Sequence, residues 1–592
     1  DDAGAATPAA APTPAPAPAT SRRNFLRAGG LGLAGLVVGG AAGAAAGAAI
    51  GHSIGVEDGR EEFGPLNPNT EPGFEHIVVL MGENRAFDNL LGWLYTPDTL
   101  PAGATFDGLA FGNYSNEAPD GRDVPAHVYA GDTDKVMGMP NPDPGEEYPH
   151  VNTQLFGTVS PATNAKLYAD QMEYPYNAPS FGEKPKMDGF VKDYHINFER
   201  LYQGTAPTEE QGDQIMGGFS PQMLPVLSTL AREFAVFDHW FAAVPSQTYC
   251  NRSFFHASTS HGYVTNKGDG GYDKWLNAEA TPTVFNRLEA AGKSWRVYYD
   301  ELQLISMTGM LHAPVLEKYW ATEHFATMAQ FYKDASEGTL PDYAFIEPRM
   351  VYNHNDFHPP FGELKESVVD GMLVVDSAIS DVRAGEALVN DVYTAIKTSA
   401  STKGSNALNT LLLITFDEHG GTYDHVPPPS AVPPVAGAQV GEMGFGFDRL
   451  GVRVPAIAVS AYTRAGTVLN EEMHHGSLIA TLNRQHGLEP LNDRDAGANT
   501  LHSVVNLTQP RDPSTWPTPT PQYLPPNPQA NAPQPGHAHR DKPLSPPGRG
   551  LVGLLLARYG SADEKEDEAA TFGDAYNALH KYGEGLFGKE AE

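Results

Sequence analysis

The stretch NTLLLITFDEHGGTYDHVPPP, residues 409–429, joins a run of apolar residues to a group of charged ones. Its LLLITF segment has the composition of a strand that is buried on both faces. Asp417 and Glu418 follow directly, and two adjacent carboxylates at a buried strand end are costly unless a cation lies against them. The two glycines after the next histidine predict a turn in which the backbone passes close to that cation. The stretch therefore predicts a buried strand that ends at a cation site.

Four further segments have the same apolar composition, and helical patterns lie between them. The predicted strands are residues 76–81, 294–299, 343–347 and 454–460, and the helical patterns include residues 282–293, 325–338 and 385–399. Alternating strands and helices are typical of a mainly parallel sheet with helices on both faces. The fold class predicted from the pattern is therefore α/β.

The composition is that of an acidic, globular chain. The 592 residues are 41% hydrophobic, which favours a packed body over disorder. The formal net charge of −33 argues against a nucleic-acid partner, because phosphate backbones are bound by clustered Lys and Arg. The single cysteine, Cys250, cannot form an intrachain disulfide. No pattern in the sequence fixes an oligomeric state.

The N-terminal segments indicate export. Residues 1–20 are an Ala/Pro-rich lead with the composition of a disordered segment. Residues 21–50 begin with SRRNFLR and continue into a Gly/Ala-rich apolar stretch, which is typical of a signal for the twin-arginine (Tat) export machinery. We therefore expect a periplasmic or secreted protein. The stretch is long enough to span a membrane, so its retention as an N-terminal anchor is the alternative to its removal.

The rest of the chain divides by composition. A polar linker over 51–73 leads into a catalytic domain over 74–505. Residues 506–549 are rich in proline and cannot form a helix or a central strand. Residues 550–592 have helical periodicity and predict a small helix that docks on the body.

Polar side chains follow the predicted strands at their carboxyl ends, where parallel sheets collect functional groups. The residues are Glu83 and Asn84 after the first strand, and His354, Asp356 and His358 after the third. Together with the Asp-Glu-His group of the opening stretch, they supply the oxygen and imidazole ligands of a divalent-metal hydrolase. Each group alone also fits a solvated turn or a helix cap, but their recurrence at strand ends favours a metal site.

The segment WFAAVPSQTYCNRSFFHAST, residues 240–259, offers a nucleophile. Thr248 stands where a helix opens, and free amide groups there favour an alkoxide and a bound phosphate. Arg252 adds a charge-assisted contact to phosphate oxygens. The plain alternative is that Thr248 only caps the helix. Cys250 is rejected as the nucleophile because a cysteine phosphatase has Arg six positions further on, where this chain has His256.

Six motifs carry a family resemblance: ENRAFDNLLG (83–92), PSQTYCNR (245–252), NDFHPP (355–360), TFDEHGGTYDHVPPP (415–429), FDRLGVRVPAIAVSAYTRAG (447–466) and HHGSLIATL (474–482). In this order they resemble the bacterial phosphoesterase family, which contains secreted phospholipases C and respiratory-burst-inhibiting acid phosphatases. The resemblance covers about residues 74–490. It implies a three-layer α/β/α sandwich similar to alkaline phosphatases and sulfatases, and Tat export is common in the family.

The resemblance also implies roles for single residues. The ligands of one divalent metal ion would be Glu83, Asn84, Thr248, Asp417 and Glu418, with Thr248 also acting as nucleophile. His358 and His425 would protonate the leaving group and Arg252 would bind phosphate, while His354 and His419 are further candidates for proton transfer. The candidate substrate-binding residues are His150, His354, Asn251 and Asp424. The bland alternatives are that His425 packs under the proline turn and that His354 is exposed.

The substrate stays open between a phospholipid headgroup ester and a small phosphomonoester. The loop Ser246-Gln247-Thr248 departs from the Gly-Pro-Thr/Ser of the family, and a Pro-rich tail stands where its phospholipases often carry β-domains. A sulfatase-like hydrolase is disfavoured because the sequence lacks the sulfatase maturation motif. A catalytically silent surface binding protein is disfavoured because the implied metal ligands are intact.

Overall fold

The computed structural model describes residues 72–131, 133–180, 182–360, 366–369, 372–375, 381–435, 437, 440–523, 540–567 and 569–588. The chain divides into two compact units, residues 1–54 and 55–592, and all the described residues belong to the second. The Ala/Pro-rich lead, the Tat-type signal and nearly all of the linker therefore lie outside the described residues. The middle of the Pro-rich segment, residues 524–539, lies outside them as well.

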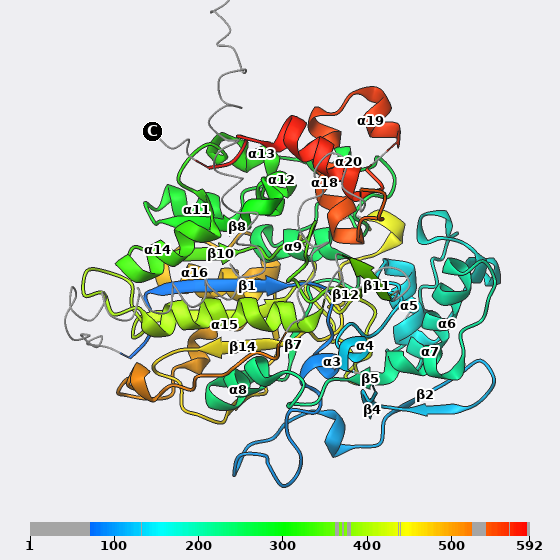
Figure 1. Cartoon of the computed structure of the whole chain (residues 1–592), viewed down its shortest axis with the longest axis horizontal. Helices are drawn as coiled ribbons and strands as arrows, with labels where there is room; N and C mark the ends of the chain where they lie inside the picture. The colour runs from blue at the N-terminus through cyan, green and yellow to red at the C-terminus, as the bar shows by residue number, and fades with distance from the viewer. Residues whose placement is uncertain are drawn as a thin grey trace, which may run out of the picture. The chain divides into compact units, whose positions relative to one another are not determined.

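A central eight-stranded sheet organises the described chain (Figure 1). Its order is β15 (Thr467–Leu469), β6 (Ala235–Phe237), β14 (Ala456–Val459), β13 (Thr410–Phe416), β1 (His76–Gly82), β10 (Tyr343–Ile346), β8 (Trp295–Tyr299) and β9 (Phe325–Thr327). Each neighbouring pair is parallel except the two that involve β14, which runs antiparallel to β13 and to β6. The sheet is therefore mainly parallel, as the sequence predicts.

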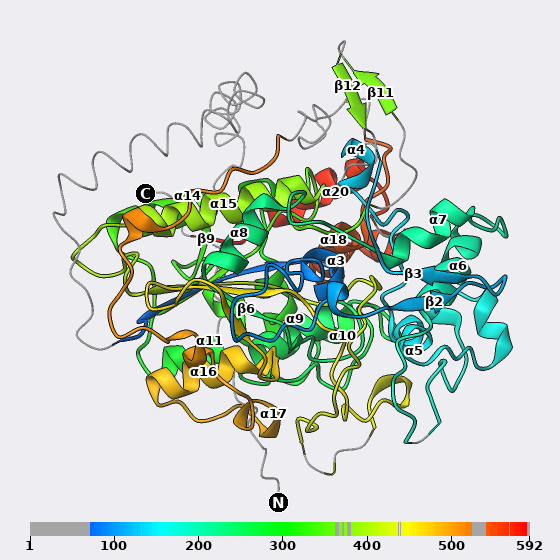
Figure 2. The ribbon, with the colours of Figure 1, turned by 90° about the horizontal axis from the view of Figure 1, so that it is seen from below.

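Helices cover both faces of this sheet, which makes three layers (Figure 2). One layer holds α8 (Pro225–Glu233), α14 (Met328–Glu337) and α15 (Val382–Thr398), and the other holds α9 (Thr248–Ala257), α11 (Val284–Ala290) and α16 (Gly476–His486). All seven residues of β13 are buried, as expected for a strand that is covered on both faces. The predicted α/β/α sandwich is confirmed.

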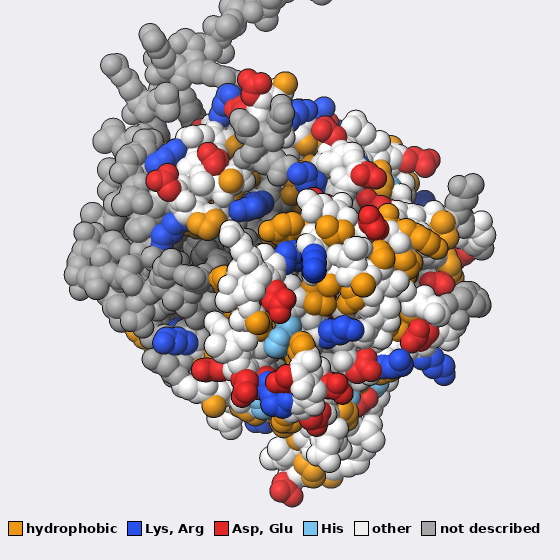
Figure 3. Space-filling view, turned by 90° about the vertical axis from the view of Figure 1, so that its right-hand side faces the viewer, with side chains coloured by type: hydrophobic (Ala, Val, Ile, Leu, Met, Phe, Trp, Pro, Cys, Tyr) orange, Lys and Arg blue, Asp and Glu red, His pale blue; other side chains and the backbone are white. Residues whose placement is uncertain are grey.

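A smaller group of helices lies beside the carboxyl ends of the strands. It consists of α5 (Tyr148–Phe156), α6 (Phe190–Leu201) and α7 (Glu209–Asp213), next to the short strand pairs β2–β3 (Ser115–Glu117, Asp123–Pro125) and β4–β5 (His127–Val128, Gly217–Gly218). Figure 3 shows the face that carries these helices, where hydrophobic side chains lie in patches among acidic and basic ones. The segment before α5 enters the site described below.

The C-terminal tail is helical and packed against the body. It contains α18 (Pro546–Tyr559), α19 (Ala562–Asp567), α20 (Phe572–Ala578) and the short π-helix η10 (Leu579–Gly583). Ten residues of α18 are buried, so this helix is a core element rather than one that lies on the surface by a single face. Among the described residues, no helix combines the length and apolar character needed to cross a membrane.

Candidate active site

The carboxyl ends of β1 and β13 bring the first acidic residues together. The two strands are parallel neighbours in which Gly82 pairs with Phe416, so the residues that follow, Glu83 and Asp417, leave the sheet side by side. The backbone N–H of Asn84 donates to Asp417 Oδ1 at 3.1 Å. The strand-end argument from the sequence therefore holds for these three residues.

Two glycines allow the chain after Glu418 to fold back onto the site. Gly420 and Gly421 have φ of 58° and 67°, in the left-handed region that favours glycine. A Cβ atom would lie 2.3 Å from the Asn84 carbonyl oxygen at the first position and 2.4 Å from the Gly145 carbonyl oxygen at the second. The sequence predicted a turn in which the backbone passes close to a cation, and the structure shows that the two glycines admit two neighbouring backbones.

Thr248 lies in this cluster at the start of α9. The N-cap is Gln247, so Thr248 is the first helical residue and not the cap. Its hydroxyl donates to Glu83 Oε2 at 3.2 Å. One turn later, Arg252 donates from Nε and Nη2 to Glu83 Oε1 at 2.9 and 2.5 Å, and its Nε lies 3.6 Å from Asp417 Oδ2. A hydroxyl, two carboxylates and a guanidinium thus meet in a buried space.

Asn251 holds the loop that leads to Thr248. Its Oδ1 accepts from the Val244 N–H at 3.0 Å, and its Nδ2 lies 2.6 Å from the Ser246 carbonyl oxygen and 3.2 Å from those of Val244 and Gln247. Both polar atoms of the side chain are therefore engaged by backbone, which leaves none for the substrate. The structure replaces the predicted substrate-binding role with a positioning role.

One observation supports a divalent cation at the implied metal ligands. Asn84 Oδ1, Asp417 Oδ2 and Glu418 Oε1 are buried oxygens that accept no hydrogen bond within the described residues. Buried acceptors are normally paired, and an orphaned one costs about 1–3 kcal/mol. Oxygen atoms from carboxylate and amide groups are the ligands that Mg²⁺ and Ca²⁺ prefer. With Glu83 and Thr248 beside them, these residues would hold the ion.

Burial sets the protonation of the acidic residues in this cluster. It raises the pKa of Glu83 well above its usual range, against the opposing effect of Arg252. Burial, and then the charge of Glu146, likewise raises the pKa of Glu418 well above its usual range. The pKa of Glu146 itself rises to about 8, by burial and then by the neighbouring Glu147. A bound cation opposes these shifts because it favours the ionised carboxylates.

A histidine outside the predicted set supports Asp417. His475 Nδ1 accepts from the Trp240 indole N–H at 3.3 Å, so its Nε2 carries the proton and donates to the Asp417 carbonyl oxygen at 2.5 Å. Burial lowers the pKa of His475 to about 4, which keeps this ring neutral. The resemblance gave His475 a supporting role, although HHGSLIATL departs there from the usual motif of the family.

His358 faces a second acidic group next to Asn84. Its Nδ1 donates to the Pro359 carbonyl oxygen at 2.6 Å, and its Nε2 accepts from Asn84 Nδ2 at 3.1 Å. Burial lowers the pKa of His358 to about 4. Because Nε2 carries no proton, His358 is not placed to protonate a leaving group. Asp143, Glu146 and His358 each offer one ligand atom within 4.8 Å of the others.

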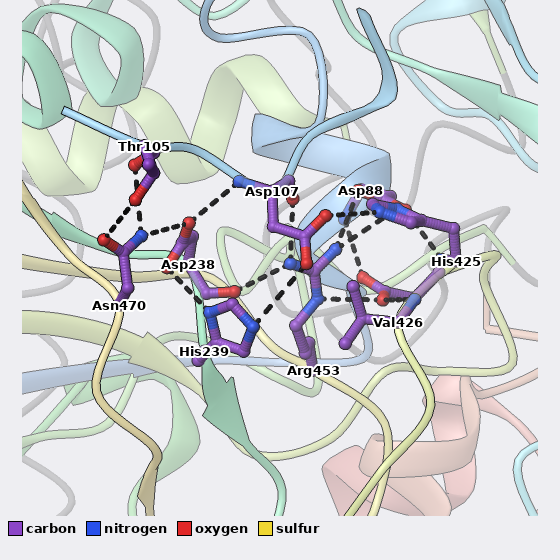
Figure 4. A network of polar contacts seen from close by, with 10 residues as sticks. Asp88, Thr105, Asp107, Asp238, His239, His425, Val426, Arg453 and Asn470 are labelled. Carbon is purple, nitrogen blue, oxygen red and sulfur yellow. Dashed lines mark hydrogen bonds and ion pairs between the residues drawn. The ribbon is translucent and has the colours of Figure 1, made fainter. Parts of the chain in front are cut away.

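His425 and Asp424 belong to a different polar network (Figure 4). The ring of His425 bonds to Asp88 Oδ2 at 2.6 Å and to Asp107 Oδ1 at 2.9 Å. Asp424 accepts from Arg453 Nε at 2.9 Å, and Arg453 also donates to Asp88 Oδ1 at 3.1 Å. The figure shows the guanidinium of Arg453 beside the carboxylates of Asp88 and Asp107.

This network fixes the charge of His425. Burial alone lowers its pKa, but Asp88 and Asp107 outweigh burial and raise the pKa to about 9. Both ring protons are donated to carboxylates, so neither is directed at Thr248. Both oxygens of Asp424 are also engaged, by Arg453 and by the N–H groups of Asp88 and Val426. The structure thus gives neither residue the free atoms that the predicted roles require.

The three remaining candidates are likewise engaged, and His419 bonds through Nε2 to Gln154 Oε1 at 2.8 Å. His150 donates from Nδ1 to Asp193 at 2.8 Å and accepts from Arg200 at Nε2 at 2.9 Å. His354 contacts Asp356 at 2.8 Å and the hydroxyl of Ser545 at 2.9 Å, and only 1% of its surface is exposed. Neither ring offers a nitrogen to a substrate. The alternative of an exposed His354 is also wrong.

Asp143 and Glu146 are the acidic residues that sequence reasoning missed. They lie in DPGEEYPHVNTQLFG, residues 143–157, a segment that drew attention only through His150. The available signal was the density of carboxylates before a predicted helix, which is also the ordinary composition of a helix N-terminus. Only the fold shows that this segment meets Asn84 and Gln247, which donate to the two oxygens of Glu146.

Comparison with known proteins gives one family and several relatives. The model of the Phosphoesterase family matches residues 74–489. Non-specific phospholipase C3 of Arabidopsis thaliana is 32% identical over 79% of this chain and 79% of its own. Non-specific phospholipase C1 of the same plant is 33% identical over 73% of this chain and 70% of its own. Phospholipase C B of Mycobacterium tuberculosis is 24% identical over 76% of this chain and 81% of its own.

Among solved structures, a protein in the alkaline phosphatase superfamily from Vibrio parahaemolyticus is 11% identical. It covers 48% of this chain and 66% of its own, with a TM-score of 0.29. At this TM-score the superposition adds no argument, and the three-layer fold rests on the sheet topology.

Proposed function

The chain belongs to the Phosphoesterase family, and from that membership we propose that it is an exported, metal-dependent enzyme that cleaves phospholipid headgroup esters in the manner of a phospholipase C. The coarser statement needs no proposal: the chain is a hydrolase that acts on phosphate esters. The observation that carries the finer one is Thr248, whose hydroxyl lies against Glu83 beside the orphaned oxygens of Asn84, Asp417 and Glu418.

In the proposed reaction, Thr248 Oγ1 loses its proton and attacks phosphorus, and the bond from phosphorus to the leaving oxygen breaks. That oxygen takes up a proton from solvent and departs as the alcohol. The resulting phospho-threonine is hydrolysed by water, which releases the phosphorylated headgroup and restores the hydroxyl. A divalent cation, when bound, supplies charge neutralisation at the phosphoryl oxygens. Glu83 orients the Thr248 hydroxyl, and Arg252 holds Glu83 in place through two hydrogen bonds. Thr248 is the first residue of α9, and a helix N-terminus favours a bound phosphate.

Two observations favour a lipid over a soluble phosphomonoester. The relatives above are phospholipases C by name. In addition, the segment 427–441 carries no charged residue, although the whole chain has a net charge of −33. Its Val432, Val435 and Val440 are 54%, 61% and 66% exposed. Figure 2 shows this loop, in yellow, at the lower edge of the body. Uncharged, exposed aliphatic residues fit a zwitterionic lipid surface better than water.

This apolar loop is anchored near the nucleophile. Glu442, at its end, accepts from the N–H groups of Val264 and Thr265 at 2.7 and 3.0 Å. The next residue, Asn266, accepts from the Tyr249 N–H at 2.8 Å, directly after Thr248. A loop that is fixed in this way is held to the segment that carries the catalytic hydroxyl. The second candidate function, an acid phosphatase on small monoesters, has no such observation in its favour.

The experiment compares p-nitrophenyl phosphorylcholine with p-nitrophenyl phosphate, with and without chelator. Thr248→Ala is expected to abolish cleavage of the choline ester, by about 10³-fold or more, and Thr248→Ser to retain part of it. Cleavage of the monoester alone would replace the phospholipase proposal with the acid phosphatase one. Full activity of Thr248→Ala would refute the mechanism. Export is tested separately, by Arg22→Lys/Arg23→Lys and cell fractionation, and is refuted if the doubly substituted chain is still exported.

A further inference from the structure

We propose that Asp143, Glu146 and His358 form a second divalent-cation site, next to the cation site at Thr248. The three side chains each place a ligand atom within 4.8 Å of the others, and all are buried. His358 Nε2 lies 3.8 Å from Asp143 Oδ2. The family resemblance assigns one cation and none of these three residues as its ligand, so the second site comes from the geometry alone.

One polar atom in the group lacks a partner. Only 6% of the surface of Asp143 is exposed, and its Oδ1 accepts no hydrogen bond within the described residues. A buried carboxylate oxygen normally has a donor, so this atom is available to an ion. Glu146 meets the amides of Asn84 and Gln247, which leaves a further lone pair on each of its oxygens.

The hydrogen bond that His358 makes through Nδ1 is typical of a histidine that binds a metal. Nδ1 donates to the Pro359 carbonyl oxygen at 2.6 Å, which fixes the tautomer and leaves Nε2 unprotonated near Asp143 and Glu146. Nε2 accepts from Asn84 Nδ2 at 3.1 Å, and a bound ion would take the place of that hydrogen bond. Histidines that bind metals almost always donate their other ring N–H to a carbonyl or carboxylate in this way. The sequence had proposed a proton donor here, but an unprotonated nitrogen that faces two carboxylates is a ligand.

The buried side chain of Arg85 holds the loops that carry these three residues. Arg85 donates to the Phe357 carbonyl oxygen at 2.7 Å and to the Met139 carbonyl oxygen at 2.5 Å. Asn197 donates to the Asp143 carbonyl oxygen at 3.0 Å. The backbones on both sides of the group are therefore fixed before any ion binds, as a pre-organised site requires.

The buried cluster is rich in carboxylates. Glu83, Asp143, Glu146, Asp417 and Glu418 are all buried, and Arg252 contacts two of them, Glu83 and Asp417. Buried carboxylates are costly without a cation beside them, and a phosphate ester would add negative charge. A second cation at Asp143 and Glu146 would lower that cost beside carboxylates other than those that Arg252 contacts.

The two sites differ in ligand chemistry. The ligands at Thr248 are all oxygen atoms, which suit Mg²⁺ or Ca²⁺, whereas the second group includes an imidazole nitrogen, which suits Mn²⁺ or Zn²⁺ better. Nitrogen coordination is thus the signature that separates the second site from the first. The proposal concerns ion binding and does not depend on which ester is cleaved, so it can fail while the proposed function stands.

The test uses the full chain, stripped with EDTA and loaded with Mn²⁺. We expect two ions per chain by mass-spectrometric metal analysis, and a directly bound nitrogen in the electron spin echo modulation of the Mn²⁺ signal. His358→Gln and Asp143→Asn should each lose one ion, with at least tenfold weaker binding at that site, and His358→Gln should lose the nitrogen signal. Glu418→Gln should lose the other ion and keep the nitrogen signal.

Two controls separate ligation from general damage. His419→Gln changes the histidine whose Nδ1 lies 3.3 Å from Glu418 Oε2, and His312→Gln changes a buried histidine outside both groups. Both should keep two ions and the nitrogen signal, and thermal unfolding shows which variants are folded. One ion per chain in the wild type without a nitrogen signal would overturn the proposal. So would two ions that persist in both His358→Gln and Asp143→Asn.

Discussion

Asn251→Asp distinguishes a residue that positions Thr248 from one that binds substrate. The change keeps size and shape, and the new carboxylate still accepts from the Val244 N–H. It removes the Nδ2 donor from a position with carbonyl oxygens at 2.6, 3.2 and 3.2 Å. Because Asn251 is fully buried, the carboxylate also faces these oxygens without solvent. Both effects act on the loop before Thr248 and not on a ligand.

The magnitude follows from the number of donors. An amide nitrogen has two hydrogens, so two carbonyl groups lose their bond, at about 1–3 kcal/mol each when buried. The expected loss is about 4 kcal/mol. For a folded chain of about 500 residues the unfolding entropy is about 1 kcal/mol per degree, so the thermal midpoint should fall by about 4 °C.

The assay measures the thermal midpoint together with kcat and KM for the choline ester. We expect a lower midpoint and a kcat that falls at least tenfold at nearly constant KM, because the loop holds the attacking hydroxyl. Asn277→Asp, an exposed asparagine at the end of a short helix, is the matched control and should change neither quantity. A raised KM with an unchanged midpoint would refute the positioning role and restore the substrate-binding one.

Three further results are expected. Gly420→Ala should lose activity and metal binding, because the φ of Gly420 is 58° and the new Cβ would lie 2.3 Å from the Asn84 carbonyl oxygen. The control Gly487→Ala has a φ of 64° and open space around the new Cβ, so it should lower the unfolding free energy by only about 1 kcal/mol in a denaturant titration. Equal effects of the two substitutions would contradict this. The pKa of His425 is raised to about 9 from 6.5, so the stability that its ion pairs contribute is complete below pH 6.5 and is lost as pH rises through 9. The urea unfolding midpoint of the wild type should fall between pH 6.5 and 9, and that of His425→Gln should not. The same pH dependence in both proteins would count against the ion pairs. Mn²⁺ at 100 times its dissociation constant should raise unfolding free energy by about 2.7 kcal/mol, less in Glu418→Gln, and an unchanged melting curve would speak against a preformed site.

The sequence predicts the long strands and misses the short ones for a physical reason. The apolar runs at 76–81 and 411–416 correspond to β1 and β13 because strands that are buried on both faces need unbroken apolar side chains. The strands β6, β9 and β15 have three residues each, too few to show any periodicity. Nor can an apolar run show direction, so the antiparallel pairing of β14 was not predictable.

For the candidate site, too, the sequence predicts the position of some residues and cannot predict that of others. Glu83 and Asp417 follow adjacent parallel strands, and a rule about strand ends is enough to bring them together. A histidine has no such rule, because its role depends on partners that are far away in sequence. Those of His425 are Asp88 and Asp107, more than 300 positions earlier. His150, likewise, is engaged by a helix that the sequence did not relate to it.

The placement of the two acidic groups implies a division of labour within the pocket. Glu83 and Asp417 are held by the register of β1 and β13, so their geometry cannot change without disturbing the sheet. Asp143 and His358 sit on loops, and Arg85 ties those loops together through the carbonyl oxygens of Met139 and Phe357. Loops accept insertions and substitutions that a buried sheet does not. The carboxylates beside Thr248 are therefore set by the sheet, whereas the positions of Asp143 and His358 depend on loop contacts such as those of Arg85.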